Sequence, residues 1–422
     1  MSKALPHNPS KSLLVLLGIG ILMTVLMSLI LPMATIADEV FHLAQIALFK
    51  ASSYTIVPAL TMPPTYHFVV GKIAGIFGVE TFSGIRMVSA GISCVAVILA
   101  WVYLQNQKST FPLLQSVQLL FSPLLWPVYW ILYTDIPSLI TTILSLILLI
   151  NQRYLLSALV CLASLCFRQH NIFWVLLIWL MAMVQTGCWT RLLEVFKSSS
   201  QSFFHKAIVA AQKCLTSTGM YLFPIVCFMG FVYFNNGIAI GDRQVQQFGG
   251  LYPLQIFSCL FVLGFILLPL HISNIPKILM LLKKHLWLIL LLGGLFVLYM
   301  KTFKIVHLHN FPSDYFLRNW LLYFLDGHFR YKVAAFGLIA LAFLSLIVTP
   351  LRDKENYWLY PVTILALLPV SLIEQRYYIV PFTLLMLFRQ PKDLATELTL
   401  LAWFVTLSAG ITYGMSTMKF FI

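Results

Sequence analysis

Acidic side chains are scarce in this sequence. Only 13 Asp and Glu stand among 422 residues, against 27 Lys and Arg, and charged residues of all kinds make up 9% of the chain. Hydrophobic residues make up 60%, which is more apolar surface than a soluble fold can bury. The apolar runs are long and continuous and do not alternate, which indicates helices and not strands. The composition therefore predicts an all-α, polytopic helical membrane protein.

The signatures of several soluble catalytic domains are also missing. The sequence has no P-loop, no Gly-x-Gly-x-x-Gly after a strand and no Gly-x-Ser-x-Gly, so a nucleotide sugar held by a Rossmann domain is not expected. The seven cysteines form no Cys-x-x-Cys pair. With no metal-ligand cluster, we expect no required cofactor and no divalent metal. The basic residues are scattered through short loops, so the net charge of +14 does not indicate a nucleic-acid partner.

The apolar runs predict about thirteen transmembrane helices in a single domain that covers residues 1–422. The positive-inside rule places the amino terminus, with Lys3 and Lys11, in the cytosol. Alternation across the membrane then places the carboxyl terminus on the far side. The expected spans are residues 13–34, 84–104, 111–132, 136–150, 154–167, 171–186, 219–234, 253–272, 286–303, 333–350, 356–373, 377–390 and 398–416.

Three segments between these spans have distinct characters. Residues 187–218 are rich in Lys and Arg and contain one acid, Glu194, so we expect a cytosolic loop. Residues 35–80 and 304–332 fall on the far side. The first of these contains amphipathic helices and the acidic motif, although residues 64–79 could instead form a short span.

The most informative stretch is the one that follows the first span, residues 38–45, Asp-Glu-Val-Phe-His-Leu-Ala-Gln. Two carboxylates at a membrane edge are costly unless they are used. If this stretch is helical, Asp38, His42 and Gln45 share one face, because residues four and seven apart lie above one another. Such a face can bind or deprotonate a sugar hydroxyl. The alternative is an interfacial amphipathic helix whose charges face water.

Other polar groups project to the same side of the membrane in this topology. Arg168, Arg243 and Arg376 are suited to phosphate, since guanidinium binds phosphate through two parallel hydrogen bonds. A catalytic base and phosphate-binding arginines at a membrane edge suit glycosyl transfer from a lipid phosphate. Each group also has a structural interpretation: Asp135 as a helix cap, Asp242–Arg243 as a local ion pair, and Arg376 as a residue that reaches to headgroups.

Four stretches in this order resemble one known family. Residues 38–45 resemble its Asp-Glu-Ile-Phe-His-x-x-Gln signature, and residues 167–174 resemble Phe-Arg-Gln-Thr-Asn-Ile-x-Trp. Residues 236–243 resemble Asn-Gly-Gly-Ile-x-x-Gly-Asp-Arg with one glycine fewer, and residues 374–381 resemble Glu-x-Arg-Tyr-x-x-x-Pro. The family is the dolichyl-phosphate-glucose α-1,2-glucosyltransferases, which belong to the GT-C superfamily of multispan transferases.

The resemblance implies a dolichyl (polyprenyl) phosphate glucose donor and a diglucosylated lipid-linked oligosaccharide acceptor. It implies inversion at the anomeric carbon and a lumenal site in the endoplasmic reticulum membrane, or a periplasmic site in the plasma membrane of a bacterium. Asp38, with Glu39 beside it, would carry the catalytic base. The expected substrate-binding residues are His42, Gln45, Arg168, Gln169, Asn171, Asp242, Arg243, Asp314, Glu374, Arg376 and Tyr377.

One family motif is not intact. The Asp-Asn-Arg-His-Tyr run of the last large external loop is replaced here by residues 310–315, followed by Arg318 and Asn319, which puts the acceptor in doubt. Two alternatives stay open. The chain could be a related GT-C mannosyltransferase or bacterial polyprenyl-phosphate-sugar transferase, or a non-catalytic transporter or channel-modulating subunit.

Overall fold

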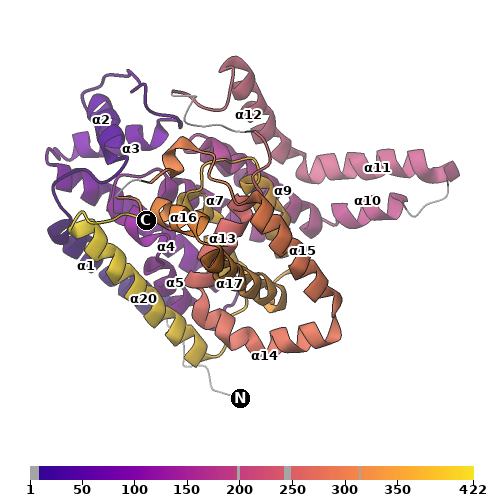
Figure 1. Ribbon diagram of the computed structural model, residues 1–422. Helices are drawn as coiled ribbons and strands as arrows, with labels where there is room; N and C mark the ends of the chain where they lie inside the picture. The colour runs from indigo at the N-terminus through magenta and orange to yellow at the C-terminus, as the bar shows by residue number, and fades with distance from the viewer. Residues whose placement is uncertain (1–8, 197–199, 242–248, 313–314) are drawn as a thin grey trace.

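The computed structural model describes residues 9–196, 200–241, 249–312 and 315–422, and throughout this part of the chain the regular elements are helices (Figure 1). The prediction of an all-α protein is confirmed. The α-helices are α1 (Pro9–Ile30), α2 (Glu39–Lys50), α3 (Thr65–Ile76), α4 (Phe82–Asn106), α5 (Pro112–Leu120), α6 (Trp126–Trp130), α7 (Asp135–Ile150), α8 (Tyr154–Leu165), α9 (Ile172–Gln185), α10 (Cys188–Phe196), α11 (Ser200–Thr218), α12 (Leu222–Phe234), α13 (Pro253–Ile266), α14 (Leu268–Lys284), α15 (Trp287–Thr302), α16 (Leu317–Gly327), α17 (Phe329–Val348), α18 (Leu359–Leu367), α19 (Ile379–Phe388) and α20 (Leu394–Ser416).

Five helices of the described chain are long and apolar enough to cross a membrane, and up to seven segments qualify if each bent helix pair is counted as one span. The chain is therefore a multi-pass membrane protein, while the number thirteen stays a prediction. The Asp38 motif follows the carboxyl end of α1, opposite Pro9 at the start of that helix (Figure 1). Phe421, near the other end of the chain, lies 6.4 Å from Tyr133 between ring centroids, on the Asp38 side.

Prolines break two of the expected spans, so the expectation that each is one continuous helix is wrong. In 111–132, α5 ends at Leu120, Pro123 lies between it and the short α6, and Pro127 lies in the first turn of α6. In 253–272, α13 and α14 meet at 98°, where Pro269 lies in the first turn of α14. A proline has no N–H to donate and restricts the residue before it, so a continuous helix ends there.

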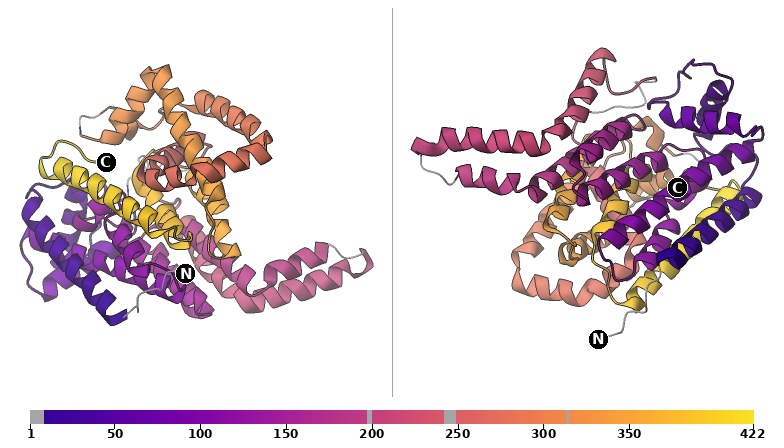
Figure 2. Two further views of the ribbon diagram at one scale, coloured as in Figure 1. Left: turned by 90° about the horizontal axis from the view of Figure 1, so that it is seen from below. Right: turned by 180° about the vertical axis from the view of Figure 1, so that it is seen from behind.

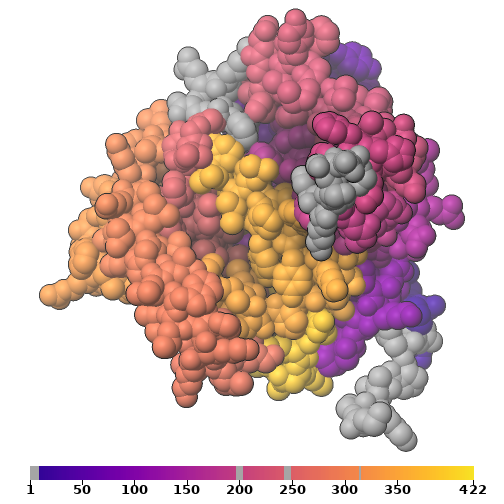
Figure 3. Space-filling view, turned by 90° about the vertical axis from the view of Figure 1, so that its right-hand side faces the viewer, coloured from indigo at the N-terminus to yellow at the C-terminus, as the bar shows by residue number. Residues whose placement is uncertain are grey.

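The segment expected as a cytosolic loop, 187–218, is instead largely a helical hairpin formed by α10 and α11. Gly187, with φ +72°, follows the end of α9 and takes the left-handed conformation that commonly ends a helix. The chain then turns by 75° into α10. The hairpin projects from the body of the protein (Figures 1 and 2), and Figure 3 views it end-on. The loop was expected from the many Lys and Arg of this segment. Its apolar residues, however, recur at helical spacing, and the segment forms helices.

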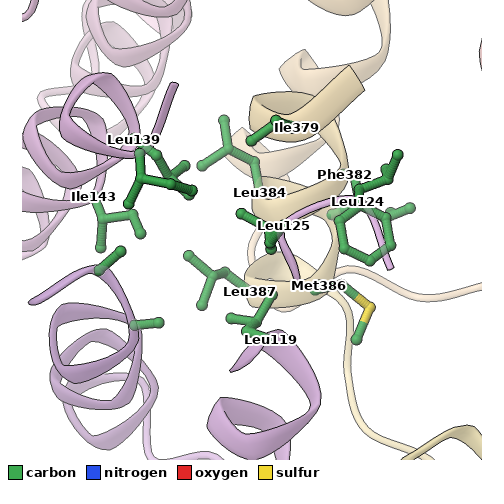
Figure 4. Close-up of a cluster of buried hydrophobic side chains, with 14 of the residues drawn as sticks. Leu119, Leu124, Leu125, Leu139, Ile143, Ile379, Phe382, Leu384, Met386 and Leu387 are labelled. Carbon is green, nitrogen blue, oxygen red and sulfur yellow. The ribbon is translucent and has the colours of Figure 1, made fainter. Parts of the chain in front are cut away.

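Helix α19 lies at the centre of the hydrophobic core. Nine of its ten residues are buried, and its side chains pack against those of α5 and α7 (Figure 4). A helix that is apolar on all sides belongs inside a bundle, so the expected span 377–390 is an internal helix. A short 3₁₀ turn, Gln375–Tyr378, precedes it. This packing fixes the position of Arg376.

Candidate active site

Asp38 lies at the amino end of α2, directly after a strained residue. Ala37 has φ +49°, a conformation that costs a residue with a Cβ about 1 kcal/mol. The Asp38 backbone N–H donates to the Tyr133 hydroxyl at 3.2 Å. Its carboxylate stays 43% exposed and lies 3.1 Å from Nη2 of Arg376. Asp38 is therefore a carboxylate that is both paired with a cation and accessible.

Glu39 has the opposite environment, because its carboxylate is fully buried. It accepts hydrogen bonds from the backbone N–H groups of Ile36 (2.8 Å) and Leu132 (2.9 Å). It also pairs with Arg86 of α4 through Nε at 2.9 Å and through Nη2. Arg86 in turn donates to the backbone carbonyls of residues 32 and 34. The Asp38–Glu39 pair thus divides into an accessible acid and a buried acid that holds the loop in place.

The predicted helix is present, but its buried face differs from the expected one. His42 and Gln45 lie on the buried face of α2 together with Glu39, whereas Asp38 precedes the helix. Sequence reasoning missed Arg86, and the available signal was a lone charge inside an apolar run of membrane length.

Arg376 bridges two acids. Its Nε and Nη2 donate to the two oxygens of Glu374 at 2.7 and 2.8 Å, and its guanidinium lies 4.7 Å from the Tyr133 ring centroid. Nη2 of Arg318 lies 3.4 Å from Oε1 of Glu374, the oxygen that also accepts from Nε of Arg376. Burial acts to raise the pKa of Glu374, but Arg376 and Arg318 outweigh it and hold that pKa at about 2. Glu374 therefore remains ionised and fixes Arg376 beside Asp38.

This depressed pKa predicts a pH-dependent contribution to stability. Glu374 ordinarily titrates at 4.5 and here at about 2, so its contribution of about 3 kcal/mol is complete above pH 4.5 and is lost as the pH falls toward 2. Unfolding of the wild type and of Glu374→Gln should be compared in detergent at several pH values. The difference in the free energy of unfolding between the wild type and Glu374→Gln should shrink by about half between pH 6 and pH 3. A gap that stays constant over this range would contradict the assignment.

A second ion pair lies beside the first. Asp135 is the first residue of α7, and its carboxylate pairs with Arg168. Asp135 makes no cap hydrogen bond, and the helix is preceded by Thr134, so the capping interpretation is wrong. A small pocket of about 20 Å³ lies between the two ion pairs, and Arg168, Arg376 and Tyr377 line it together. The structure thus brings Asp38, Asp135, Arg168, Glu374 and Arg376 together, whereas their roles in the site stay a prediction.

His42 pairs with another imidazole inside the first external segment. Its Nδ1 lies 2.8 Å from Nε2 of His67 on α3. Burial lowers the pKa of His67 to about 4, and burial, with repulsion between the two rings when both are protonated, lowers the pKa of His42 well below its ordinary value. Both rings are neutral at physiological pH, so His42 is not a charged ligand for phosphate.

Three amides expected to bind substrate instead hold the backbone. Gln45 donates to the Thr55 carbonyl (2.9 Å) and accepts from the Val57 N–H (2.7 Å). Gln169 donates to the carbonyls of residues 61 and 238. Asn171 accepts from Ser138 and donates to the Ser164 carbonyl. These groups fix the loops around the site, while their expected role in binding substrate stays a prediction.

The motif at 236–243 is described up to Gly241. A Cβ on Gly241 would collide with the carbonyl oxygens of Pro58 and Leu60, so only glycine fits where this loop meets the first external segment. Three expected site residues, Asp242, Arg243 and Asp314, lie outside the described residues. Among those that are described, no group of three or more His, Cys, Asp or Glu could hold a metal ion.

A second pocket, of about 50 Å³, opens next to the ion pairs. Arg168, Gln169 and Tyr377 line it together with His307. Its lining is both polar and apolar, which suits a sugar held against aromatic and amide groups. The residues that form it come from segments far apart in the sequence, from Met62 to Tyr377.

Comparison with known proteins gives one family. A sequence model described as the DIE2/ALG10 family matches residues 33–387. A Candida albicans protein named Dol-P-Glc:Glc(2)Man(9)GlcNAc(2)-PP-Dol α-1,2-glucosyltransferase is 29% identical over 73% of this chain and 70% of its own length. Proteins of the same name from Debaryomyces hansenii and Homo sapiens are 22% and 23% identical, over 89% and 82% of this chain and 88% and 82% of their own lengths.

Among solved structures, the crystal structure of ArnT from Cupriavidus metallidurans bound to undecaprenyl phosphate is similar. It is 13% identical, with a TM-score of 0.39, over 98% of this chain and 77% of that one. A TM-score this low does not establish a shared fold.

Proposed function

This chain belongs to the DIE2/ALG10 family, and we propose on that premise that it transfers glucose from a dolichyl or other polyprenyl phosphate to the terminal glucose of a diglucosylated, diphosphate-linked oligosaccharide. The relatives' name gives this donor, this acceptor and an α-1,2 linkage. The chain is thus an α-1,2-glucosyltransferase, a membrane-bound hexosyltransferase. We further propose a GT-C-like architecture and a lumenal site in the endoplasmic reticulum membrane, since the eukaryotic relatives build an N-glycan precursor.

The observation that carries the chemical proposal is the contact between Asp38 and Arg376. In an inverting transfer, an acceptor hydroxyl attacks the anomeric carbon while the bond to the donor phosphate breaks. The hydroxyl proton passes to a carboxylate and the bonding electrons leave with the phosphate. Asp38 is accessible to a substrate and Glu39 is not, so we assign the base to Asp38.

The same ion pair accommodates the change in charge. When Asp38 accepts the proton it loses its negative charge, and the leaving phosphate gains one. The total charge around Arg376 then stays constant, and the guanidinium is released from Asp38 as phosphate charge appears. Preorganised cations of this kind stabilise a transition state without reorganisation of solvent.

The direct experiment is transfer by the purified chain in nanodiscs. Polyprenyl-phosphate glucose and polyprenyl-phosphate mannose would be supplied in parallel with a diglucosylated lipid-linked acceptor. We expect transfer of glucose alone, detected as a one-hexose gain that an α-1,2-specific glucosidase removes. Transfer of mannose alone would identify the alternative hexosyltransferase. Ion or solute transport with no transfer from either donor would favour the non-catalytic alternatives.

A further inference from the structure

Arg318 is a largely buried arginine with unused hydrogen-bond donors. Its side chain is 12% exposed, and its Nη2 lies 3.4 Å from the Glu374 carboxylate. Its Nε and Nη1 are buried and have no partner among the described residues. Leaving charged donors unpaired and away from water costs free energy that a bound anion would recover. The guanidinium also stacks on Phe316, 4.3 Å from the ring centroid, which fixes its plane.

The backbone around Arg318 is held on both sides. The Leu317 N–H donates to the Phe421 carbonyl at 2.9 Å. Asn319 donates through its amide to the carbonyls of His309 (2.8 Å) and Phe311 (3.0 Å). Arg318 is therefore preorganised, and an anion that binds it pays little to order the side chain.

The other arginines of the cluster are committed to acids. Arg376 makes a two-point contact with Glu374 and a third contact with Asp38. Arg168 is paired with Asp135. Arg318 shares Glu374 with Arg376 through its longer contact, so it is the arginine best placed to accept a further negative charge.

Apolar space adjoins this guanidinium. Arg318 lines a cavity of about 60 Å³ whose other walls are mainly apolar side chains of α13, α15 and α16. Phe257 and Ile339 line this cavity and also a second, almost wholly apolar one of about 480 Å³ between α13, α15, α17, α18 and α19. Ligand pockets of this kind have volumes of about 300–1,000 Å³. A cation at the end of apolar space fits a phosphate joined to a hydrocarbon chain.

The geometry points to Arg318 as the residue that binds the phosphate of the polyprenyl donor, with the first isoprene units in the adjoining cavity and the chain continuing past Phe257 and Ile339 into the larger one. In this assignment Arg318 makes the direct contact with the phosphate, where the motifs alone would place Arg168 and Arg376, and Arg376 acts on the phosphate charge from the other partner position on Glu374. A monoanionic phosphodiester would accept from Nε or from Nη1, which lie on different edges of the planar guanidinium, and either donor completes a two-point fork with Nη2.

The donor fits this site better than the acceptor does. This step rests on the proposed function. The donor phosphate is bonded to the anomeric carbon that reacts, and Arg318 is linked to Asp38 by a chain of contacts through Glu374 and Arg376. The acceptor's diphosphate is separated from the reacting glucose by an oligosaccharide of two glucoses, nine mannoses and two N-acetylglucosamines. Such a diphosphate cannot lie beside the base.

The test is binding of sugar-free polyprenyl phosphate to the full chain in phosphatidylcholine nanodiscs. Arg318→Gln should weaken binding roughly 10- to 100-fold, the loss expected for a charge-assisted double hydrogen bond. Arg318→Lys should recover part of the affinity, because it keeps the charge but loses the fork. Arg330→Gln is the matched control, since Arg330 is an exposed arginine of the next helix, and it should change nothing. The thermal unfolding of each variant shows whether it is folded.

Steady-state transfer separates the two lipid substrates. In Arg318→Gln the KM for the donor should rise while the KM for the acceptor stays constant. In Ala340→Trp, which fills the larger cavity, binding of a long-chain polyprenyl phosphate should weaken several-fold and binding of geranyl phosphate should not.

Three outcomes would overturn the assignment: unchanged polyprenyl phosphate binding in a folded Arg318→Gln, a rise in the acceptor KM alone, or loss of binding to competing phosphatidylglycerol. The binding assay contains no sugar, so it is independent of the proposed function. If polyprenyl phosphate binding depends on Arg318 but no glucose is transferred, the phosphate site stands and the proposal that glucose is the transferred sugar is wrong. If glucose is transferred but binding does not depend on Arg318, the proposed function stands and the phosphate site is wrong.

Discussion

Asp38→Asn should abolish glucosyl transfer, with a fall in kcat of about 100- to 10,000-fold, the usual contribution of a positioned general base. Asparagine keeps the size of the side chain and an oxygen toward Arg376, but it cannot accept the acceptor proton. Asp38 contributes only one ion pair and is 43% exposed, so the variant should fold and bind donor. The measurement is single-turnover transfer in nanodiscs, with donor and acceptor binding measured separately.

The chain offers a matched control for this variant. Asp326 is 44% exposed and is also paired with one cation, Lys332 at 2.7 Å, but it lies on α16 away from the ion-pair cluster. Asp326→Asn should leave kcat within about twofold, because an exposed ion pair contributes little. Substantial residual transfer by Asp38→Asn would assign the base elsewhere.

The position of the site was predictable because charged residues are easy to identify in an otherwise apolar sequence. Acids and arginines are rare in membrane spans, and the positive-inside rule sorted the stretches around Asp38, Arg168 and Arg376 onto one side. The structure brings them into contact although more than 300 positions separate Asp38 from Arg376. One side of a thin membrane is a small volume, so sidedness limits which residues can meet.

The roles of individual residues were less predictable, because roles depend on partners that are distant in sequence. Gln45 and Gln169 have the chemistry of sugar ligands, yet the amide donors of both, and the acceptor of Gln45, bond to backbone groups up to 108 positions away. Arg318 was noted only as a neighbour of an altered motif. Its significance comes from the absence of partners for Nε and Nη1 among the described residues, which no sequence pattern reveals.

The helix boundaries depend on local features, such as prolines, that a hydropathy profile does not show. The prolines at 123, 127 and 269 are visible in the sequence. An average hydropathy over a window of residues does not register that a helix breaks near a proline, so it merges the neighbouring helices into one span. The apolar sequence of α19 predicted a span but not its burial, because lipid and protein core are equally apolar. The packing of α4, α5 and α18 against it places it in the core.

Glu39→Gln should destabilise the protein by about 3–5 kcal/mol, the cost of removing one partner of a buried ion pair. Glu39 and Arg86 are 0% and 5% exposed, so the charge left on Arg86 has little access to water. The glutamine amide would also present donors to the Leu132 N–H or to Arg86, which are themselves donors. Unfolding in detergent would measure this loss of stability as a lower Tm. The variant should also express poorly.

The control is Glu80→Gln, which removes a 78% exposed carboxylate paired with Lys50 and should change stability by less than about 1 kcal/mol. The double variant Glu39→Gln, Arg86→Gln should lose less than the sum of the single losses, because two neutral amides can hydrogen-bond to each other. A Glu39→Gln protein that is as stable as the wild type but inactive would make Glu39 a participant in catalysis. Retained activity per folded molecule would establish Glu39 as the residue that positions Asp38, because the two adjacent acids would then differ in role as they differ in burial.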